Sequence, residues 1–205
     1  ILANLYASEK NYELSNFYIK ISLFLNKNFL TNQTLLAENF YYQGLNKTSI
    51  DTYKLIKSIG SIYSWYAVKT IAFISVEDKG KKKSIKLLEK ELNLISNITF
   101  EHYYDFANFC KDNQYFEKSI KFYSLTLEKI PNNHNLISKI FDRRGTSYER
   151  IGDWESAEKD LKKSLSISPD EPHVLNYLAY TWVDKGINLN EALEMLKKAV
   201  SLRQN

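Results

Sequence analysis

The fold of this chain is decided by residues 144–169, whose sequence is RGTSYERIGDWESAEKDLKKSLSISP. This stretch predicts a helix, a tight turn at Gly152 and Asp153, a second helix and a stop at Pro169. Small and bulky residues alternate where the two helices must approach each other, at Gly145, Tyr148, Trp154, Ala157 and Leu161. A single helical hairpin cannot bury its own apolar face, so the stretch requires neighbours of the same kind.

Two series of small residues repeat along the chain. The first opens the expected second helix of each hairpin, at Ser15, Ser49, Ser84, Ser119, Ala157 and Ala192. Its intervals are 34, 35, 35, 38 and 35 residues. The second series lies twelve or thirteen residues upstream, at Ala3, Ala37, Ala72, Ala107, Gly145 and Ala179. Two independent series in one register indicate a repeat protein.

The pattern resembles the tetratricopeptide repeat, which has a period of about 34 residues and one helix–turn–helix per unit. In the stretch that ends at Pro169, the residues at the family's positions are Phe141, Gly145, Tyr148, Ala157, Leu161 and Pro169. Two residues depart from the family pattern, because Arg144 replaces a leucine and Ser164 replaces an alanine. The resemblance covers essentially the whole chain and is strongest in the last three units.

The resemblance implies an all-α, right-handed α-solenoid of about six helix–turn–helix hairpins. We expect a single solenoid over residues 1–205, with units at 1–29, 30–62, 63–97, 100–131, 138–169 and 172–203. We expect Gly60 to close the second helix of the second unit. The chain begins inside a helix without an initiating methionine and ends without a polar cap, which predicts a fragment of a longer protein.

The composition is typical of a folded globular chain, with 44% apolar and 25% charged residues. No run approaches the 18 or so apolar residues that a membrane span requires. A net charge of +4 is too small to indicate a nucleic-acid partner by itself. A single cysteine excludes an internal disulfide framework.

Candidate catalytic groups are scattered along the chain. His102, His134 and His173 fall in different units, and no histidine, cysteine or aspartate cluster has the spacing of metal ligands. Cys110 stands where the family has a large residue that faces the neighbouring helix, so we expect a packed core thiol. The sequence has no glycine-rich phosphate loop. We therefore predict that the chain is not an enzyme and binds no metal or cofactor.

The densest basic segment is Lys79 to Lys83, extended by Lys86. We interpret it as a solvated turn between two helices, because it has no interleaved aromatic residues for base stacking. Contact with an acidic partner or a membrane surface is the alternative.

The family resemblance also implies where a partner binds, because the first helices of tetratricopeptide hairpins line a concave groove that receives a peptide or a partner's helix. The groove residues that it implies are Tyr66, Lys69, Tyr104, Asn108, Lys139, Asp142, Arg143, His173, Asn176, Tyr177 and Tyr180. Neighbouring positions of the same surface are Thr34, Glu38, Tyr41, Phe73, Lys111 and Thr146. Tyrosines mixed with both signs of charge suit peptide recognition.

Some family members hold a partner's C-terminal carboxylate in a clamp of lysines, asparagines and an arginine. Lys69, Lys139 and Arg143 match three of the five clamp positions. Phe73 and Asp105 occupy the two asparagine positions, and an aspartate there would repel the carboxylate. We therefore predict that this clamp is absent.

The sequence thus predicts a non-catalytic scaffold that binds a protein or peptide in the groove. Self-association through open solenoid ends, RNA binding by helical repeats and an adaptor role beside a catalytic domain elsewhere in the parent protein are the alternatives. RNA binding would require RNA retention that is lost when Lys81, Lys82 and Lys83 are neutralised. The last unit is similar to repeats of bacterial exported tetratricopeptide proteins, which implies the periplasm or envelope, with the cytoplasm as the alternative.

Overall fold

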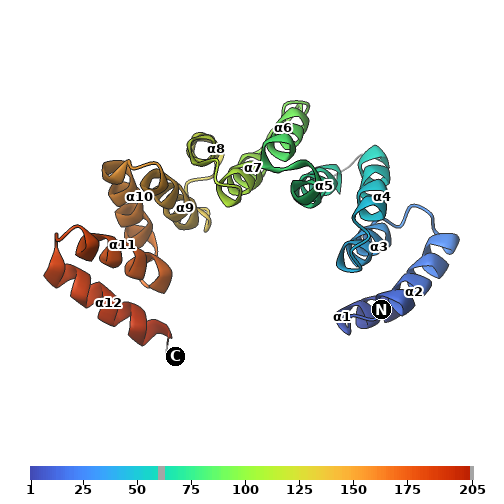
Figure 1. Ribbon diagram of the computed structural model, residues 1–205, viewed down its shortest axis with the longest axis horizontal. Helices are drawn as coiled ribbons and strands as arrows, with labels where there is room; N and C mark the ends of the chain where they lie inside the picture. The colour runs from blue at the N-terminus through green and yellow to red at the C-terminus, as the bar shows by residue number, and fades with distance from the viewer. Residues whose placement is uncertain (60–62, 204–205) are drawn as a thin grey trace. The chain divides into compact units, whose positions relative to one another are not determined.

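The computed structural model describes residues 1–59 and 63–203, and the described residues are almost entirely helical (Figure 1). Its twelve described helices are α1 (Leu2–Ser8), α2 (Tyr12–Leu25), α3 (Leu30–Tyr42), α4 (Asn46–Ile59), α5 (Tyr63–Lys79), α6 (Lys81–Leu92), α7 (Phe100–Asp112), α8 (Phe116–Lys129), α9 (Ile137–Arg150), α10 (Trp154–Ile167), α11 (Pro172–Asp184) and α12 (Leu189–Arg203). Consecutive helices pair into six hairpins, and no strand occurs among these residues. The predicted all-α fold is confirmed, whereas Gly60 lies outside the described residues.

The helices form two compact units, Ile1–Ser96 and Asn97–Asn205. Unit 1 contains the hairpins α1–α2, α3–α4 and α5–α6. Unit 2 contains α7–α8, α9–α10 and α11–α12.

The two small-residue series mark the contacts between the helices of each hairpin. Ser15 donates a hydrogen bond of 2.8 Å from its Oγ to the carbonyl of Ala3, and Ser49 donates the same bond to Ala37. At Gly145 the helices approach so closely that an added Cβ would lie 3.1 Å from the carbonyl oxygen of Ala157. The predicted role of the small residues is confirmed, because a larger side chain at these positions would separate the helices.

Each hairpin reverses direction at a residue with a left-handed backbone. These residues are Lys10, Gly44, Gly80, Gln114, Gly152 and Gly186, with φ between 60° and 85°. Four of the six are glycines, the residue that adopts this conformation without steric cost.

The predicted basic turn at Lys79–Lys83 is wrong in one respect. The reversal takes place at Gly80 alone, with φ 78°, so Lys79 ends α5 and Lys81 begins α6. The side chains of Lys81, Lys82 and Lys83 are exposed on the first turn of α6. These lysines are therefore a solvated helix end rather than a loop.

Cys110 of α7 is fully buried in unit 2, as the sequence predicts. The core around α10, α11 and α12 is built on Leu161, Leu178 and Trp182, each with no exposed surface. This packing fixes the backbone of α11, and the close contact of Gly145 with Ala157 and Leu161 fixes α9 against α10.

Candidate partner-binding pockets

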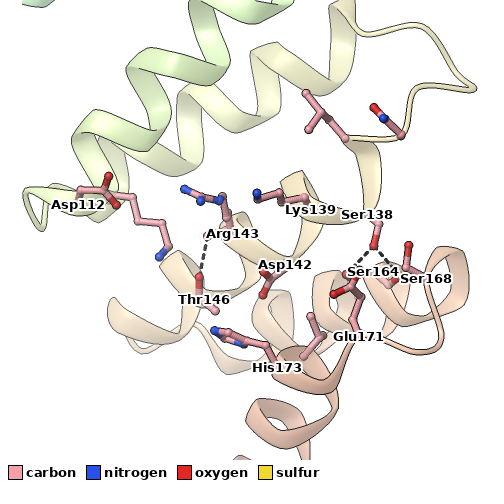
Figure 2. A pocket seen from close by; sticks show the side chains of 14 residues that line it. Asp112, Ser138, Lys139, Asp142, Arg143, Thr146, Ser164, Ser168, Glu171 and His173 are labelled. Carbon is pink, nitrogen blue, oxygen red and sulfur yellow. Dashed lines mark hydrogen bonds between the residues drawn. The ribbon is translucent and has the colours of Figure 1, made fainter. Parts of the chain in front are cut away.

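Unit 2 contains a pocket of about 520 Å³ between α7, α9, the end of α10 and the start of α11 (Figure 2). We call it the charged pocket. Its lining residues are Lys111, Asp112, Asn135, Leu136, Ser138, Lys139, Asp142, Arg143, Thr146, Ser164, Ser168, Glu171, His173 and Val174. The volume lies within the range of small-ligand and side-chain sites.

The wall formed by α7 and α9 is cationic. The guanidinium of Arg143 donates a hydrogen bond of 2.8 Å from Nη1 to Oδ1 of Asn108. The same oxygen accepts a 2.7 Å hydrogen bond from the hydroxyl of the buried Tyr123. Two donors therefore fix the Asn108 amide, and the amide fixes Arg143 at the pocket.

Lys111 stands on the same wall. Burial, and then the positive charge of Arg143, lower the pKa of the Lys111 ammonium below its ordinary value. No carboxylate forms an ion pair with Lys111 or Lys139 in the part of the chain that the structure describes. Asp112 and Asp142 nevertheless act on Lys111 at longer range and favour its charged form.

One partly buried carboxylate faces these cations. Figure 2 shows Asp142 between Arg143 and His173. Its Oδ1 is buried and accepts no hydrogen bond. Burial raises the pKa of Asp142, an effect opposed first by His173 and then by Lys111 and Arg143. Asp112 and Glu171, the other acids of the pocket, are exposed.

The charged pocket contains several of the residues that the sequence predicts, and others that it does not. Lys139, Asp142, Arg143 and His173 line it, and Asn108 supports it. Residues that the sequence reasoning missed are Asp112, Asn135, Leu136, Ser138, Ser164, Ser168, Glu171 and Val174. Most of these residues lie on α10, in the connections between helices or at helix ends. The sequence prediction considered only the exposed faces of the first helix of each hairpin, so it did not include them.

The predicted residues farther along α11 do not line this pocket. Tyr177 donates a 2.8 Å hydrogen bond to Oε2 of Glu149, and burial followed by this bond raises the pKa of its hydroxyl. Asn176 is exposed, and Tyr180 is 68% exposed. Tyr104 packs against Tyr123, with ring centroids 6.3 Å apart. These residues flank or support the pocket rather than line it.

Unit 1 has a second pocket of about 520 Å³, between α1, α3 and α5, which we call the aromatic pocket. It is lined by Asn4, Thr31, Thr34, Leu35, Glu38, Tyr63 and Tyr66. Tyr66 donates a 2.7 Å hydrogen bond to Oε1 of Glu38, and burial followed by this bond raises its pKa to about 12. The ammonium of Lys69 lies 6.0 Å from the centroid of the Tyr66 ring. Tyr66 thus lines the aromatic pocket, and Lys69 stands beside it.

Metal-binding clusters and membrane-spanning helices are both absent among the described residues. No group of three or more histidine, cysteine, aspartate or glutamate side chains there could hold a metal ion. Within the same residues, none of the helices combines the length and apolar character that a membrane crossing demands.

The family comparison identifies the repeat. Residues 138–171 match the family model for the tetratricopeptide repeat. No curated protein sequence matches the chain significantly.

Solved structures share the fold at low sequence identity. They include MamA, residues 41 to the end, from Desulfovibrio magneticus RS-1, with a TM-score of 0.65 and 12% identity over 86% of this chain and 96% of that one. The tetratricopeptide-like repeats of a putative kinesin light chain from Podospora anserina give a TM-score of 0.64 and 14% identity, over 85% of this chain and 94% of that one. A chain of the APC/C hetero-tetramer Cut9–Hcn1 gives a TM-score of 0.64 and 14% identity over 98% of this chain and 38% of that one.

These matches define the class of protein. Residues 138–171 match a tetratricopeptide repeat, and the paired helices of the described residues share the fold of solved tetratricopeptide-repeat structures. This fold is a general scaffold for protein–protein interaction.

Proposed function

We propose that the chain is a protein-interaction module that holds an extended segment of a partner protein in the charged pocket of unit 2. The observation that carries this proposal is the convergence of charged side chains from three helices on one pocket of about 520 Å³. Lys111 comes from α7, Lys139, Asp142 and Arg143 come from α9, and His173 comes from α11.

The construction of the pocket supports binding rather than a purely structural role. Residues with a structural role in this unit are paired, as the bidentate ion pair between Arg144 and Asp160 illustrates. Lys111, Lys139 and Arg143, by contrast, form no direct ion pair with a carboxylate of the described residues, although Asp112 and Asp142 lie in the same pocket. Charged groups held partly desolvated on a rigid backbone are typical of binding sites.

The proposed partner is a protein segment because the fold is one of protein-interaction scaffolds. Hydrogen-bond donors and acceptors of the pocket stand on helices that are folded before a partner binds. A partner would therefore bind without ordering the receptor, which keeps the entropic cost of binding low. We propose that the chain acts by binding and not by catalysis.

A steric block tests this proposal without changing the charge of the pocket. Peptides selected on the intact protein from a random display library would be measured against Asn135→Trp and Ser168→Trp, which place an indole on two sides of the pocket. Asn132→Trp is the matched control, because Asn132 lies on the same connection between α8 and α9 but does not line the pocket.

We expect both pocket variants to lower peptide affinity by roughly tenfold or more, as when a central interface contact is lost. The control should bind as the parent protein does. The proposal is overturned if the library yields no binders, or if the binders are equally affected by all three tryptophans.

A further inference from the structure

One face of α2 in unit 1 is apolar and exposed. Phe17, Ile21 and Phe24 are four and then three residues apart, which places them on the same side of this helix. We call these three residues the apolar stripe. Phe17 is 56% exposed and Phe24 is 84% exposed, so the described helices leave most of the stripe open.

The other hairpins place polar residues at the same positions. Ser15 of α2 is equivalent to the later members of its small-residue series, so positions at a fixed distance beyond them are also equivalent. The residues equivalent to Phe17 are Asp51, Lys86, Lys121, Lys159 and Glu194. Those equivalent to Phe24 are Ser58, Asn93, Glu128, Ser166 and Ser201.

All ten of these equivalent residues are exposed, as the two phenylalanines are. The repeat therefore turns these positions outward in each hairpin, and charged or polar residues are the usual choice for a solvated helix face. A contiguous apolar face at such positions is typical of an interaction surface. The apolar stripe is thus a feature of α2 and not a requirement of the fold.

Lysines border the apolar stripe. Lys20 lies on α2, and Lys27 lies in the connection to α3. Both side chains are exposed, and neither forms an ion pair with the described residues. The connection itself is held in place, because the carbonyl of Lys27 accepts a 2.6 Å hydrogen bond from Nε2 of Gln33.

Unit 1 as a whole is also positively charged. It contains 13 lysines against 8 aspartates and glutamates, a net charge of +5, whereas unit 2 has 15 lysines and arginines against 16 acids, a net charge of −1. In α6 the exposed Lys86 and Lys90 stand at the positions equivalent to Phe17 and Ile21. This charge disfavours a second copy of unit 1 at the stripe and favours an anionic surface.

The shape of the stripe suits a lipid surface. Phe24 and the adjacent Leu25 protrude, with 84% and 79% of their surface exposed, and neither lines the charged pocket or the aromatic pocket. A partner helix would instead lay its apolar face into a groove. Protruding phenylalanine and leucine side chains can enter the boundary between headgroups and acyl chains, while lysine ammonium groups stay at the phosphates.

We infer that α2 docks on the surface of an anionic lipid bilayer. The apolar stripe and Leu25 enter the boundary between headgroups and acyl chains, and Lys20 and Lys27 contact the lipid phosphates. The inference is independent of the proposed function, because the charged pocket lies in unit 2.

Sedimentation of the full chain with vesicles tests this inference. One vesicle preparation is phosphatidylcholine alone, and the other contains about one third phosphatidylserine, which makes the surface potential negative. The first variant combines Phe17→Lys with Phe24→Ser, which are the residues of equivalent positions in α6 and α4. It removes the stripe while it raises the positive charge. The second variant combines Lys20→Gln with Lys27→Gln and keeps the stripe.

Each variant has a matched control. Phe73→Ser changes a phenylalanine of unit 1 that is also 56% exposed but lies on α5, the first helix of its hairpin. Lys121→Gln with Lys159→Gln removes two exposed lysines from unit 2. Circular dichroism checks that each protein is folded.

We expect the parent chain to bind the phosphatidylserine vesicles more tightly than phosphatidylcholine vesicles. The phenylalanine variant should bind them roughly tenfold more weakly or worse despite its added charge, because two apolar side chains no longer leave water. The lysine variant should lose roughly tenfold through weaker attraction to the anionic lipid. Both controls should bind as the parent does.

A second measurement does not depend on loss of binding. In Phe24→Trp the new indole should be quenched by brominated lipid in the phosphatidylserine vesicles, with fluorescence at shorter wavelength. The indole of Phe73→Trp should show neither change. These variants decide the outcome if the phenylalanine variant fails to fold.

Several results would overturn the inference. They are absence of binding to phosphatidylserine vesicles, equal binding to both vesicle types, parent-like binding by the phenylalanine variant, and equal weakening by Phe73→Ser. Failure of brominated lipid to quench Phe24→Trp would also overturn it. A parent chain that is dimeric by light scattering without lipid, beside a monomeric phenylalanine variant, would assign the stripe to a second copy instead.

Discussion

The two pockets occupy comparable places in the two units but differ in their chemistry. In unit 1 the first helices of the hairpins present Tyr63, Tyr66 and Leu35, with Glu38 engaged by a tyrosine hydroxyl. In unit 2 the first helices present charged side chains, of which Lys111 and Lys139 have no ion pair within the described residues. The repeat fixes the backbone that carries these side chains and leaves their chemistry free to differ.

The buried polar contacts between packed helices also differ, because they are neutral in unit 1 and charged in unit 2. In unit 1 the buried amide of Asn39 donates to Oγ of Ser15 and to Oδ1 of Asn16, both at 2.8 Å, so the buried contact is neutral. In unit 2 Arg144 and Asp160 form an ion pair whose side chains are 17% and 6% exposed. Neutral networks and buried ion pairs respond differently to mutation, which makes the comparison testable.

The largest expected effect is at the ion pair of unit 2. Arg144→Leu introduces the residue that the family pattern favours, but it leaves the buried carboxylate of Asp160 without its cation. We expect a loss of about 3–5 kcal/mol in the free energy of unfolding. Urea denaturation followed by the fluorescence of Trp154 and Trp182, both in unit 2, measures it.

The control for this prediction is the double variant Arg144→Leu with Asp160→Leu. It removes both charges, so most of the lost stability should return. A double variant that is less stable than Arg144→Leu alone would show that the pair contributes shape rather than charge neutralisation.

A smaller effect is expected in unit 1. Asn39→Ala removes two donated hydrogen bonds but leaves no charge unpaired, since Ser15 still donates to Ala3. We expect a loss of about 1–3 kcal/mol, measured by urea denaturation with Trp65 as the reporter in unit 1. The contrast between the units is wrong if this variant costs as much as Arg144→Leu.

The third prediction concerns pH. Because burial raises the pKa of Asp142, the folded protein disfavours its ionised form, and the destabilisation is present above the raised pKa. It disappears as the pH falls towards the ordinary value of 3.8. Asp142→Asn should therefore be more stable than the parent protein at neutral pH, and this difference should shrink on acidification.

Thermal melts of the two proteins over the acidic range measure this difference. A variant that is less stable than the parent at neutral pH, with a deficit that vanishes in acid, would mean that the ionised carboxylate stabilises unit 2.

The smallest losses in the free energy of unfolding are expected from two tyrosine variants, one in each unit, and these losses should be similar. Tyr66→Phe and Tyr177→Phe each remove one hydrogen bond from a tyrosine to a glutamate, of 2.7 and 2.8 Å. Each should lower the free energy of unfolding by about 1 kcal/mol. Denaturation of both variants side by side checks this, and a large inequality would show that the two bonds are not equivalent.

The sequence predicted the fold well because the small residues act locally. Positions such as Ala3 and Ser15 are twelve residues apart and meet within one hairpin, so their spacing reports directly on helix contact. The six hairpins and the buried Cys110 follow from this register. The reversal at Gly80 was misplaced because a run of lysines resembles a loop, whereas a single left-handed glycine is sufficient to turn the chain.

The charged pocket was predicted less completely. Lys139, Asp142, Arg143 and His173 were identified because the resemblance assigns first-helix positions to a groove. Ser164 was not, because its participation depends on how closely α10 approaches α9, which the packing at Gly145 determines. The pairing of Arg144 with Asp160 likewise depends on the rotation of α10 and not on a motif.

The central claim is that the charged pocket of unit 2, and not the aromatic pocket of unit 1, holds a segment of a partner protein. The most direct test is amide chemical-shift mapping of the full chain by NMR during titration with a peptide selected on the intact protein from a random display library. The account predicts shifts confined to residues around Lys111, Lys139, Arg143 and His173, with none at the aromatic pocket of unit 1. Shifts centred on Tyr66, or on the exposed lysines Lys81–Lys83 of α6, would contradict it.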